Sequence, residues 1–551
     1  MKASDLFVAC LVEEGVTHVF GVPGEENLDL LESLRTSPIR FVVTRHEQHA
    51  AFMAATQGRL TGRAGVCLST LGPGATNLLT GIAHAQLGGM PLLAITGQKP
   101  VHQNLQGNFQ LVDVVPVFAP LTKWNHSLGS AETIPRFVRH AFKLAEAERP
   151  GAVHLELPED IAGVDVPGGR PHRRVTLRRP TADAVALDEA AAVVRSARRP
   201  LLLVSSGANR KRVGVQLRAF AEATGIAAVA TQTGKGVLPD DHPQSLFSLG
   251  LHKRDGAHLA IERADLVICV GYDIVEYPPS VWNEHDDKRI LHVDFNMAEP
   301  DQLYNPEYEL IGDIAASLAG LGERLADCDF ADAEQSRLRG ILDRSLHPVT
   351  CSDCVPVSYE RVVHDVRAVM GRDDIVSLDN GIYKLWFARG YSTLAENTLL
   401  LDNALATMGA GLAAGMAARL VSPERRVLVV VGDGGFLMNG GDLETAVRLG
   451  QDLVVLVLRD DAYGFIRWKQ AAEGFPDFAM GFGNPDFVRY AEAFGARGLR
   501  VEQAGTLAAR LTEAFELGGV VLIDCPVDGS ENARLSRDLT ADVRRQLEAS
   551  R

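Results

Sequence analysis

Short apolar runs rich in Val, Ile and Leu alternate along the chain with longer stretches in which apolar residues recur at helical spacing. Such runs predict buried strands, and their alternation with helical stretches predicts parallel sheets with helices on both faces. The chain is therefore expected to be an α/β protein. The predicted strands are 17–21, 41–44, 65–69, 91–95, 153–157, 200–205, 266–270, 290–293, 375–378, 427–431, 453–458 and 520–523.

The predicted strands fall into three blocks, and 551 residues are too many for a single hydrophobic core. Stretches 166–180 and 347–356 contain several Pro, Gly or polar residues and no helical period, which is typical of linkers. We therefore predict three doubly wound parallel-sheet domains at 1–165, 185–345 and 357–535, and a C-terminal tail at 536–551. Ser4 is the predicted cap of a first helix that ends at Gly15.

Charge and composition exclude several classes of function. The formal net charge of −15 argues against a nucleic-acid partner, which normally requires a basic face. Acidic residues interrupt the N-terminal apolar stretch, and no run approaches the ~18 apolar residues of a membrane span, so we expect a cytoplasmic protein. The Cys-x-x-Cys pair at Cys351 and Cys354 has no second pair or His ligands nearby and is interpreted as linker.

The strongest chemical signal is in the third block. The strand 427–431 leads directly into Gly432-Asp433-Gly434-Gly435, and the next strand ends at Asp460. Carboxylates at the C-terminal ends of neighbouring parallel strands lie where ligands bind in open α/β sheets. Two such carboxylates suit Mg²⁺, which shares its shell with phosphate oxygens and water. Each motif alone has a simpler interpretation, a tight turn for Gly-Asp-Gly and a helix cap for Asp460.

Two further residues, Glu47 and Met408, become candidate site residues only when they are considered together with Asp433 and Asp460. Glu47 follows a predicted strand and opens an Ala-rich helix, where the helix dipole alone would favour a carboxylate. Met408 precedes another helix and would ordinarily be a core residue. Both are raised above these simpler interpretations by the family resemblance described next, which matches Arg45-His46-Glu47 before a small-residue helix and Met408 at its spacing before Asp433.

Taken together, these motifs and their spacing resemble those of thiamine-diphosphate-dependent enzymes. Over nearly its whole length the chain is similar to the large, catalytic subunit of acetolactate synthases, in the pyruvate oxidase/decarboxylase superfamily. The resemblance is closest to the catabolic type, which does not use FAD. Further stretches that support it are 20–24, 69–77, 107–110, 121–124 and 155–160.

The resemblance implies a pyrimidine-binding, a central and a diphosphate-binding domain, in that order. It implies that Asp433, Asp460 and the carbonyl of Ala462 hold Mg²⁺, and that Glu47 is the catalytic acid that bonds the cofactor's aminopyrimidine. Cofactor-binding positions carried over from the family are Ala406, Met408, Gly432, Asp433, Gly434, Gly435, Asp460, Ala462, Tyr463, Gly464 and Gly381. The substrate pocket is expected to include Gly24, Glu25, Phe109 and Gln110.

The activity implied by the resemblance is decarboxylation of pyruvate and ligation of the remaining two-carbon unit to a second pyruvate, which gives 2-acetolactate and CO₂. The alternative is another 2-oxo acid decarboxylase or carboligase on the same scaffold. FAD is not expected, because 270–277 departs from the flavin signature of the biosynthetic members. The family arrangement implies a homodimer at least, commonly a homotetramer, and nothing in the sequence indicates a regulatory subunit. A non-catalytic regulator is disfavoured because the glutamate and metal ligands are retained, and an NAD site because no clear GxGxxG follows a strand.

Overall fold

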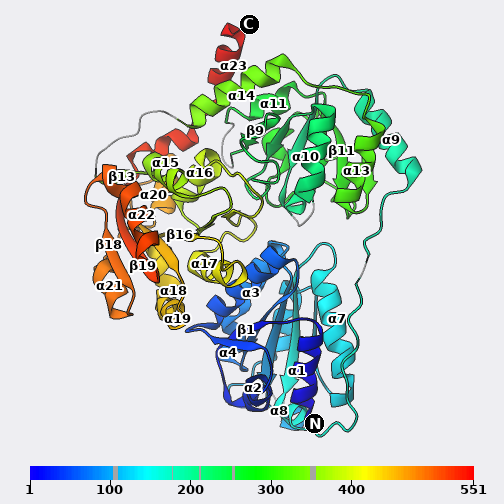
Figure 1. Cartoon of the computed structure of the whole chain (residues 1–551), viewed down its shortest axis with the longest axis vertical. Coiled ribbons are helices and arrows are strands. Elements are labelled where there is room, and N and C mark those ends of the chain that lie inside the picture. Colours follow the sequence, from blue (N-terminus) through cyan, green and yellow to red (C-terminus); the bar gives the residue numbers. More distant parts are fainter. Residues whose placement is uncertain (104–108, 177, 210–212, 251–254, 348–354, 551) are drawn as a thin grey trace. The chain divides into compact units, whose positions relative to one another are not determined.

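The computed structural model contains three parallel β-sheets, each covered by helices (Figure 1). The structure describes residues 1–550 except 104–108, 177, 210–212, 251–254 and 348–354. By its internal contacts the chain divides into two compact units. The first comprises Met1–Leu177, Ala404–Glu424 and Gly435–Leu453, and the second Arg178–Asn403, Arg425–Gly434 and Val454–Arg551.

The first unit contains a six-stranded sheet in the order β2-β1-β3-β4-β6-β5. Its strands are β1 (His18–Gly21), β2 (Arg40–Val43), β3 (Gly65–Ser69), β4 (Leu92–Gln98), β5 (Trp124–Ser127) and β6 (Ala152–Pro158). Helices α1 (Ala3–Glu13), α2 (Leu28–Arg35) and α7 (Ile134–Glu146) cover one face, where every second residue of the central strands enters an apolar core. Helix α3 (Glu47–Thr61) packs against β3, α5 (Leu79–Leu87) and α17 (Ala410–Val421). The remaining helices of this unit include α4 (Pro73–Asn77), α6 (Val114–Phe118), α8 (Glu159–Ala162) and α19 (Leu443–Arg448).

The predicted cap of the first helix is wrong by two residues. Helix α1 begins at Ala3, with Lys2 as its cap residue, and Ser4 lies fully buried in the first turn. Asp5 accepts the backbone N–H of Lys2, while the Ser4 hydroxyl accepts a hydrogen bond from Ser33 of α2. Ser4 is therefore used for helix packing, because Asp5 already satisfies the helix start.

The second unit contains the other two sheets. The central sheet has the order β12-β11-β10-β7-β8-β9, and the third sheet has the order β13-β19-β17-β16-β14-β15, with β18 paired to β19. The central strands are β7 (Pro200–Val204), β8 (Ala228–Ala230), β9 (Ser245–Ser248), β10 (Leu266–Val270), β11 (Arg289–Asp294) and β12 (Tyr308–Ile311). The third sheet comprises β13 (Val357–Ser358), β14 (Ile375–Leu378), β15 (Leu399–Leu400), β16 (Val427–Gly432), β17 (Leu453–Arg459), β18 (Arg497–Arg500) and β19 (Val520–Asp528).

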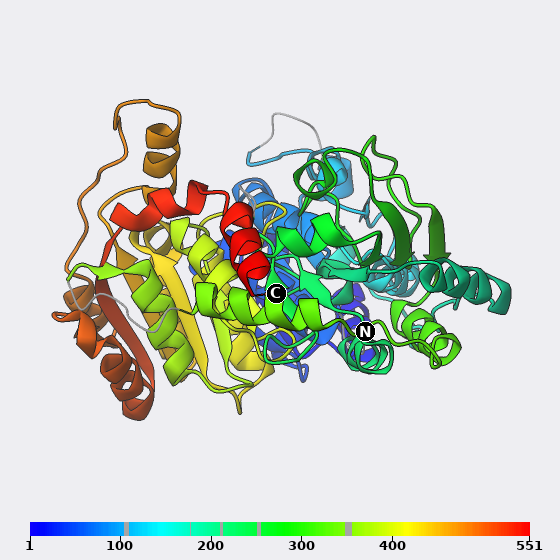
Figure 2. The same ribbon diagram turned by 90° about the horizontal axis from the view of Figure 1, so that it is seen from above.

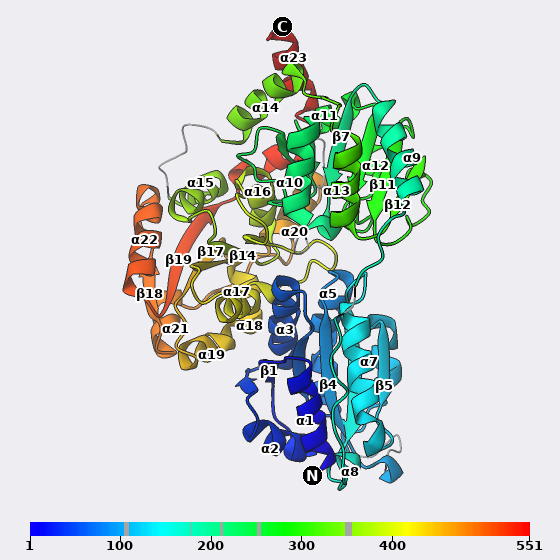
Figure 3. The same cartoon turned by 45° about the vertical axis from the view of Figure 1, so that its right-hand side comes forward.

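Helices lie on both faces of the central sheet. One face carries α9 (Ala184–Arg195), α10 (Val213–Thr224) and α13 (Ile314–Arg324), which pack on one another as Figure 3 shows. The opposite face packs against α11 (His258–Arg263), α12 (Pro279–Trp282), α14 (Ala333–Leu346) and the C-terminal α23 (Thr540–Ala549). Helix α23 lies against α14 in Figure 2, so the C-terminal residues predicted as a tail end in a packed helix.

The third sheet has its own core beneath α15 (Tyr359–Val369), α16 (Ile382–Gly390) and α22 (Leu507–Leu517). The remaining helices that follow its strands are α18 (Asp433–Asn439), α20 (Gly464–Ala472) and α21 (Phe487–Ala493). Every strand predicted from sequence is present, and every described pairing within the three sheets is parallel. The described residues of the predicted linker 166–180 contain no helix or strand. Cys351 and Cys354, in the second predicted linker, lie outside the described residues. No helix in the described part of the chain combines the length and apolar character needed to cross a membrane.

Candidate active site

The order of strands in the third sheet places one candidate site at its C-terminal edge. From β14 the chain forms β15 on one side of the sheet, and it then crosses to the other side to form β16 and β17. The direction in which strands are added therefore reverses between the neighbouring strands β14 and β16. Ligands of doubly wound sheets bind at such a switch point. Gly381 lies three residues after β14, and Asp433 follows β16 directly, so the sheet topology brings both predicted cofactor positions to this edge.

Asp433 is almost fully buried and is held by three hydrogen bonds. Its Oδ1 accepts the backbone N–H of Gly434 at 2.9 Å. Its Oδ2 accepts the N–H of Asp461 at 2.8 Å and the side-chain amide of Asn484 at 2.8 Å. Burial nevertheless raises the pKa of Asp433 above its usual range. The carboxylate is thus fixed in orientation while its charge lacks a compensating cation among its hydrogen-bond donors.

Asp460 lies beside Asp433 and shares this imbalance. Burial raises its pKa to about 7, and the charge of Asp433 adds to the effect. A Cβ atom on Gly464 would lie 2.1 Å from Asp460 Oδ2, so a side chain at the start of α20 would displace this carboxylate from its present position. Burial raises the pKa of both carboxyl groups, and the Asp433 charge adds to the rise at Asp460, an arrangement that a bound cation relieves.

The oxygen-rich surroundings are compatible with a hard cation such as Mg²⁺. Within the described ranges, no group of three or more His, Cys, Asp or Glu side chains has metal-binding geometry. Two carboxylates with a backbone carbonyl such as that of Ala462 leave room for phosphate and water, which Mg²⁺ prefers to a complete protein cage. Asn484 Oδ1 is a further oxygen, buried and without a hydrogen-bond partner among the described residues. Sequence reasoning missed Asn484, because it follows no strand and belongs to no motif.

Tyr383 supports the Gly-Asp-Gly turn from beneath. Its hydroxyl accepts the backbone N–H of Gly432 at 3.0 Å, and its ring lies 2.4 Å from where a Cβ atom on Gly381 would sit. The ring therefore occupies the space that two glycines leave open. Tyr383 is fully buried, and this burial raises the pKa of its phenol well above the usual value.

Lys384, the next residue, ties two loops of the second unit together. Its ammonium donates to Asn380 Oδ1 at 2.6 Å, to the carbonyl of Asp402 at 2.9 Å and to Asn403 Oδ1 at 3.0 Å. Burial lowers the pKa of Lys384 to about 8. Asp402 and Asn403 immediately precede the predicted cofactor segment Ala404–Gly409 in the sequence.

Glu47 occupies the equivalent edge of the first sheet. It is the first residue of α3, which begins four residues after β2, and its side chain is buried. The Oε2 atom accepts the side-chain amide of Asn77 at 2.9 Å. The Oε1 atom lies 3.2 Å from where a Cβ atom on Gly74 would sit, so a side chain at that position would crowd the carboxylate. The structure thus presents one oriented, buried carboxyl group beside a glycine.

The switch point of the first sheet lies between β1 and β3, and predicted pocket residues surround it. The chain after β1 reaches Gly24, where a Cβ atom would clash with Thr70 at 2.3 Å. On the other side, the carbonyl of Gln110 lies 2.2 Å from a Cβ position on Gly72. The Ser69–Gly74 turn is therefore bordered by two of the four predicted substrate positions.

The other two predicted pocket positions are at the surface. Glu25 is exposed, and Phe109 is 75% exposed, which is unusual for a large aromatic side chain. The acidic residue that turns inward is the next one, Glu26, which contacts Thr70 and Lys99. Sequence reasoning missed Glu26 because the short helix at Glu25–Asn27 decides which of the two neighbouring glutamates is buried. It missed Lys99 because the role of this residue depends on its contact with Glu26.

Backbone strain occurs at two predicted site residues, Gln110 and Ala406, and at Asp461, the neighbour of a third. Only a few residues of the described chain other than glycine have a positive φ, and Gln110, Ala406 and Asp461 are among them, at 57°, 55° and 54°. Such conformations cost of order 1–3 kcal/mol each and persist where surrounding structure enforces them, commonly at binding sites. Ala406 is exposed and Met408 half-buried, so the backbone and the side chain predicted to contact a cofactor are both accessible.

The switch point of the central sheet, between β7 and β10, is closed by protein. The Gly207 N–H donates to the carbonyl of Gly271 at 2.9 Å, and a Cβ atom on Gly271 would lie 2.3 Å from Ala208 N. Glu276 is buried there and accepts hydrogen bonds from Ser205 at 3.0 Å and Thr231 at 2.9 Å. The edge where a dinucleotide would bind in such a sheet therefore carries backbone contacts and a carboxylate.

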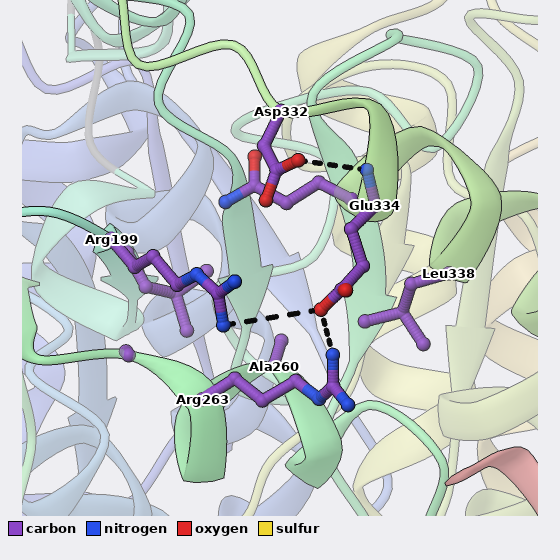
Figure 4. Close-up of a pocket in the computed structure, with 9 residues that line it drawn as sticks. Arg199, Ala260, Arg263, Asp332, Glu334 and Leu338 are labelled. Atoms are coloured by element: carbon purple, nitrogen blue, oxygen red, sulfur yellow. Dashed lines mark hydrogen bonds and ion pairs between the residues drawn. The ribbon is translucent and has the colours of Figure 1, made fainter. Parts of the chain in front are cut away.

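A small pocket lies at the opposite, N-terminal edge of the central sheet, where Arg199 precedes β7 and Ala264 precedes β10 (Figure 4). Glu334 forms ion pairs with Arg263 and Arg199, and Asp332 accepts the N–H of Glu334. The two arginines that line the pocket are therefore paired with Glu334, while Asp332 caps the start of α14, as the dashed lines in Figure 4 show. We assign it to the packing of α14 on the sheet.

The fold and both candidate sites define a class of cofactor-dependent enzyme, which the comparisons with known proteins identify. Residues 1–117 match the thiamine pyrophosphate enzyme N-terminal TPP binding domain, residues 187–321 its central domain and residues 379–525 its C-terminal TPP binding domain.

Proteins that are similar to this chain over nearly its full length identify the family within this class of enzymes. The chain is 35% identical to the acetolactate synthase of Bacillus subtilis, an alignment that covers 98% of this chain and 95% of that protein. It is 33% identical to the catabolic acetolactate synthase of Raoultella terrigena, with 97% of each chain covered. Identity to the acetolactate synthase isozyme 1 large subunit of Escherichia coli is 30%, over 96% of this chain and 94% of that one. The chain belongs to the acetolactate synthase family of thiamine pyrophosphate enzymes.

Proposed function

We propose that the protein is an acetolactate synthase that uses thiamine diphosphate and Mg²⁺ to convert two molecules of pyruvate into 2-acetolactate and CO₂. The observation that carries the proposal is the pair of carboxylates, the buried Asp433 and the half-buried Asp460, at the C-terminal edge of the third sheet beside its switch point. Both have a raised pKa, and the hydrogen bonds to Asp433 come from two backbone N–H groups and an amide rather than from a cationic side chain. A magnesium ion bound to a diphosphate would neutralise this pair.

The residues around the pair have distinct roles in this proposal. Asp433, Asp460 and the carbonyl of Ala462 would hold Mg²⁺. The small residues Gly381, Gly432, Gly434, Gly435 and Gly464 would let the diphosphate approach the backbone, with Tyr463 beside them. Tyr463 borders Gly434, where a Cβ atom would lie 3.0 Å from its ring. The backbone of Ala406 and the side chain of Met408 would hold the pyrimidine in a bent conformation.

Glu47 is proposed as the catalytic acid. Thiamine diphosphate supplies an electron sink for the release of CO₂ once the acidic C2 proton of its thiazolium has been removed. Glu47 would promote that proton transfer by hydrogen bonding to the aminopyrimidine ring, and Asn77 keeps its carboxyl group in position. The burial of Glu47 excludes water that would compete for this hydrogen bond.

The protein is proposed to work without a flavin. The closed switch point of the central sheet supports this, because Gly207, Gly271 and the buried Glu276 occupy the position where a dinucleotide phosphate would lie. A bound flavin would absorb near 450 nm in the purified protein. A colourless preparation that is fully active without added FAD is the expected result.

The alternative function is another 2-oxo acid decarboxylase or carboligase on the same scaffold. Glu47, Asp433 and Asp460 would serve such an enzyme equally well, so they do not discriminate between the two. The three-domain division predicted from sequence, 1–165, 185–345 and 357–535, is part of the proposal in either case. We also propose a cytosolic location, which suits a chain whose described cysteines are free thiols.

We further propose that the protein acts as a homodimer at least, most simply a homotetramer, in which two subunits complete each cofactor site. Mixing two inactive variants, Glu47→Gln and Asp433→Asn, tests this arrangement. A mixed dimer would then hold one intact site, made of Glu47 from one subunit and Asp433 from the other. Random mixing should restore roughly a quarter of wild-type activity. Mixtures without activity, under conditions where subunits exchange, would contradict it.

The reaction is tested by incubating the purified protein with pyruvate, thiamine diphosphate and Mg²⁺ and measuring acetolactate directly. We expect acetolactate that depends on both additions and that falls by at least a hundredfold in Glu47→Gln, in line with the loss of a general acid–base group. The exposed Glu32→Gln is the matched control and should leave the rate unchanged. Acetaldehyde and CO₂ without acetolactate would favour the alternative function instead.

A further inference from the structure

A buried ion pair lies at the switch point of the first sheet, outside the residues that the proposed function uses. Lys99 Nζ donates to Glu26 Oε1 at 2.7 Å, and Glu26 Oε2 accepts the Thr70 hydroxyl at 2.5 Å. The Glu26 side chain is only 3% exposed, whereas that of Lys99 is 23% exposed. The carboxylate is thus enclosed, while the lysine side chain remains partly exposed.

Both members of the pair are charged. Burial opposes ionisation of Glu26, but hydrogen bonds from Lys99 and Thr70 outweigh it and lower the pKa of this carboxyl. The hydrogen bond to Glu26 raises the pKa of Lys99 in turn. An ammonium has three N–H donors, and Glu26 accepts one of them. Within the described part of the chain, Lys99 therefore offers an oriented cation whose remaining N–H donors could bind a ligand.

The pair is close to the proposed catalytic carboxyl group. Thr70, which binds Glu26, and Glu47 both border Gly74, since Thr70 Cγ2 and Glu47 Oε1 lie 2.9 and 3.2 Å from the same Cβ position on that glycine. Lys99 follows β4 directly, and Glu26 and Thr70 follow β1 and β3. Three adjacent strands thus deliver an ion pair to the edge of the sheet where ligands bind.

We propose that Lys99, held in place by Glu26, binds the carboxylate of the 2-oxo acid that accepts the two-carbon unit. This inference rests on the proposed function. The donor loses its carboxylate as CO₂, and a cation paired with that group would stabilise it against leaving. The acceptor keeps its carboxylate while a carbon–carbon bond forms at its keto carbon and the keto oxygen takes a proton. A fixed ammonium therefore suits the acceptor and not the donor.

The test separates the two substrates by offering an acceptor that has no carboxylate. Wild-type and Lys99→Met proteins, loaded with thiamine diphosphate and Mg²⁺, are given pyruvate with and without saturating acetaldehyde. Acetolactate and acetoin are then quantified by NMR at neutral pH. In Lys99→Met we expect acetolactate formation to fall by about tenfold to a hundredfold, the range for loss of a hydrogen bond to a charged group. Acetoin formation from acetaldehyde should stay within about twofold of wild type.

Further variants identify a merely structural effect. Lys99→Arg keeps the charge and should restore most of the acetolactate rate, and Glu26→Gln, which loosens the lysine, should give an intermediate loss. Lys2→Met removes another lysine–carboxylate pair of the same unit, Lys2 with Asp29 at 2.5 Å, and should change neither product. Circular dichroism and cofactor titration of each variant check that the fold and the loaded state are kept.

Three outcomes would overturn the inference. Equal loss of acetolactate and acetoin would make the pair structural, and no loss of either would leave Lys99 without a role in binding. Failure of Lys99→Arg to recover activity in a folded protein would exclude recognition by charge. The wild-type reaction tests the proposed function separately, because absence of acetolactate there would refute that function whatever the variants do.

Discussion

The phenol oxygen of Tyr383 lies 3.0 Å from the backbone nitrogen of Gly432 and accepts its hydrogen, immediately before the predicted metal ligand Asp433. Strand β16 ends at Gly432, so its N–H would otherwise be left at the edge of the sheet. An aromatic side chain from α16 thus fixes the turn from which Asp433 projects. A substitution at Tyr383 therefore tests whether this contact contributes to cofactor binding.

Replacing Tyr383 with Phe should weaken binding of thiamine diphosphate and Mg²⁺ by about tenfold while the protein remains folded. The change leaves the Gly432 N–H without its acceptor, at a cost of about 1–3 kcal/mol if no water replaces it. Activation by the cofactor, titrated at saturating Mg²⁺, measures the effect. Tyr391→Phe is the matched control, since this buried tyrosine of the same core bonds Arg367 instead. Equal weakening in both variants would show that the effect is one of general stability.

Mg²⁺ binding should depend on pH through Asp460. Its pKa in the metal-free protein is raised from 3.8 to about 7, so the carboxyl group is protonated below pH 7 and must lose its proton to bind the ion. The apparent affinity for Mg²⁺ should therefore fall as the pH drops below about 7, with release of up to one proton on binding at pH 6. Calorimetry in buffers of different ionisation enthalpy measures that proton. Proton release that is absent in wild type, or unchanged in Asp460→Asn, would contradict this assignment.

The same shift makes a prediction about stability. A carboxyl group with a raised pKa in the fold contributes stability that is fully present below its unfolded pKa and is lost as the pH rises through 7. The metal-free protein should thus gain a few degrees of melting temperature at pH 8 in Asp460→Asn, and much less at pH 5. Saturating Mg²⁺ and cofactor should remove the advantage. Differential scanning calorimetry at the two pH values provides the comparison.

Phe109 should matter for substrate use and not for folding. Its side chain is 75% exposed, so Phe109→Ala should change the free energy of unfolding by no more than about 0.5 kcal/mol. If it lines the substrate pocket, the KM for pyruvate should rise severalfold while cofactor affinity stays constant. Met297→Ala, which removes a side chain that is 77% exposed in the central domain, is the control. An unchanged KM would remove Phe109 from the proposed pocket.

The fold was largely predictable because parallel strands buried on both faces give continuous apolar runs. All the predicted strands are present, whereas seven others in the described part of the chain escaped prediction, at 124–127, 228–230, 245–248, 308–311, 357–358, 399–400 and 497–500. These are two to four residues long, and their pairing partners, not their own sequence, define them. Short sheet members carry too little pattern for detection from local sequence.

The site was predictable where it depends on strand ends and spacing, as at Asp433 and Asp460. It was not predictable where one residue's partner lies far away in the sequence. Nothing near Asn484 indicates that it would contact Asp433, because the contact arises only when the loop after α20 folds back. Likewise, Glu25 and Glu26 are equivalent in sequence, and the turn of the short helix alone decides that Glu26 faces Lys99.

The most direct test of the proposed function is the ratio of pyruvate consumed to CO₂ released by the purified, cofactor-loaded protein. An enzyme that joins the two-carbon unit to a second pyruvate consumes two molecules for each CO₂, and all of the remaining carbon is recovered as acetolactate. We predict this ratio of two, without free acetaldehyde. A ratio of one, with acetaldehyde as the product, would contradict the account and make the protein a decarboxylase on the same scaffold.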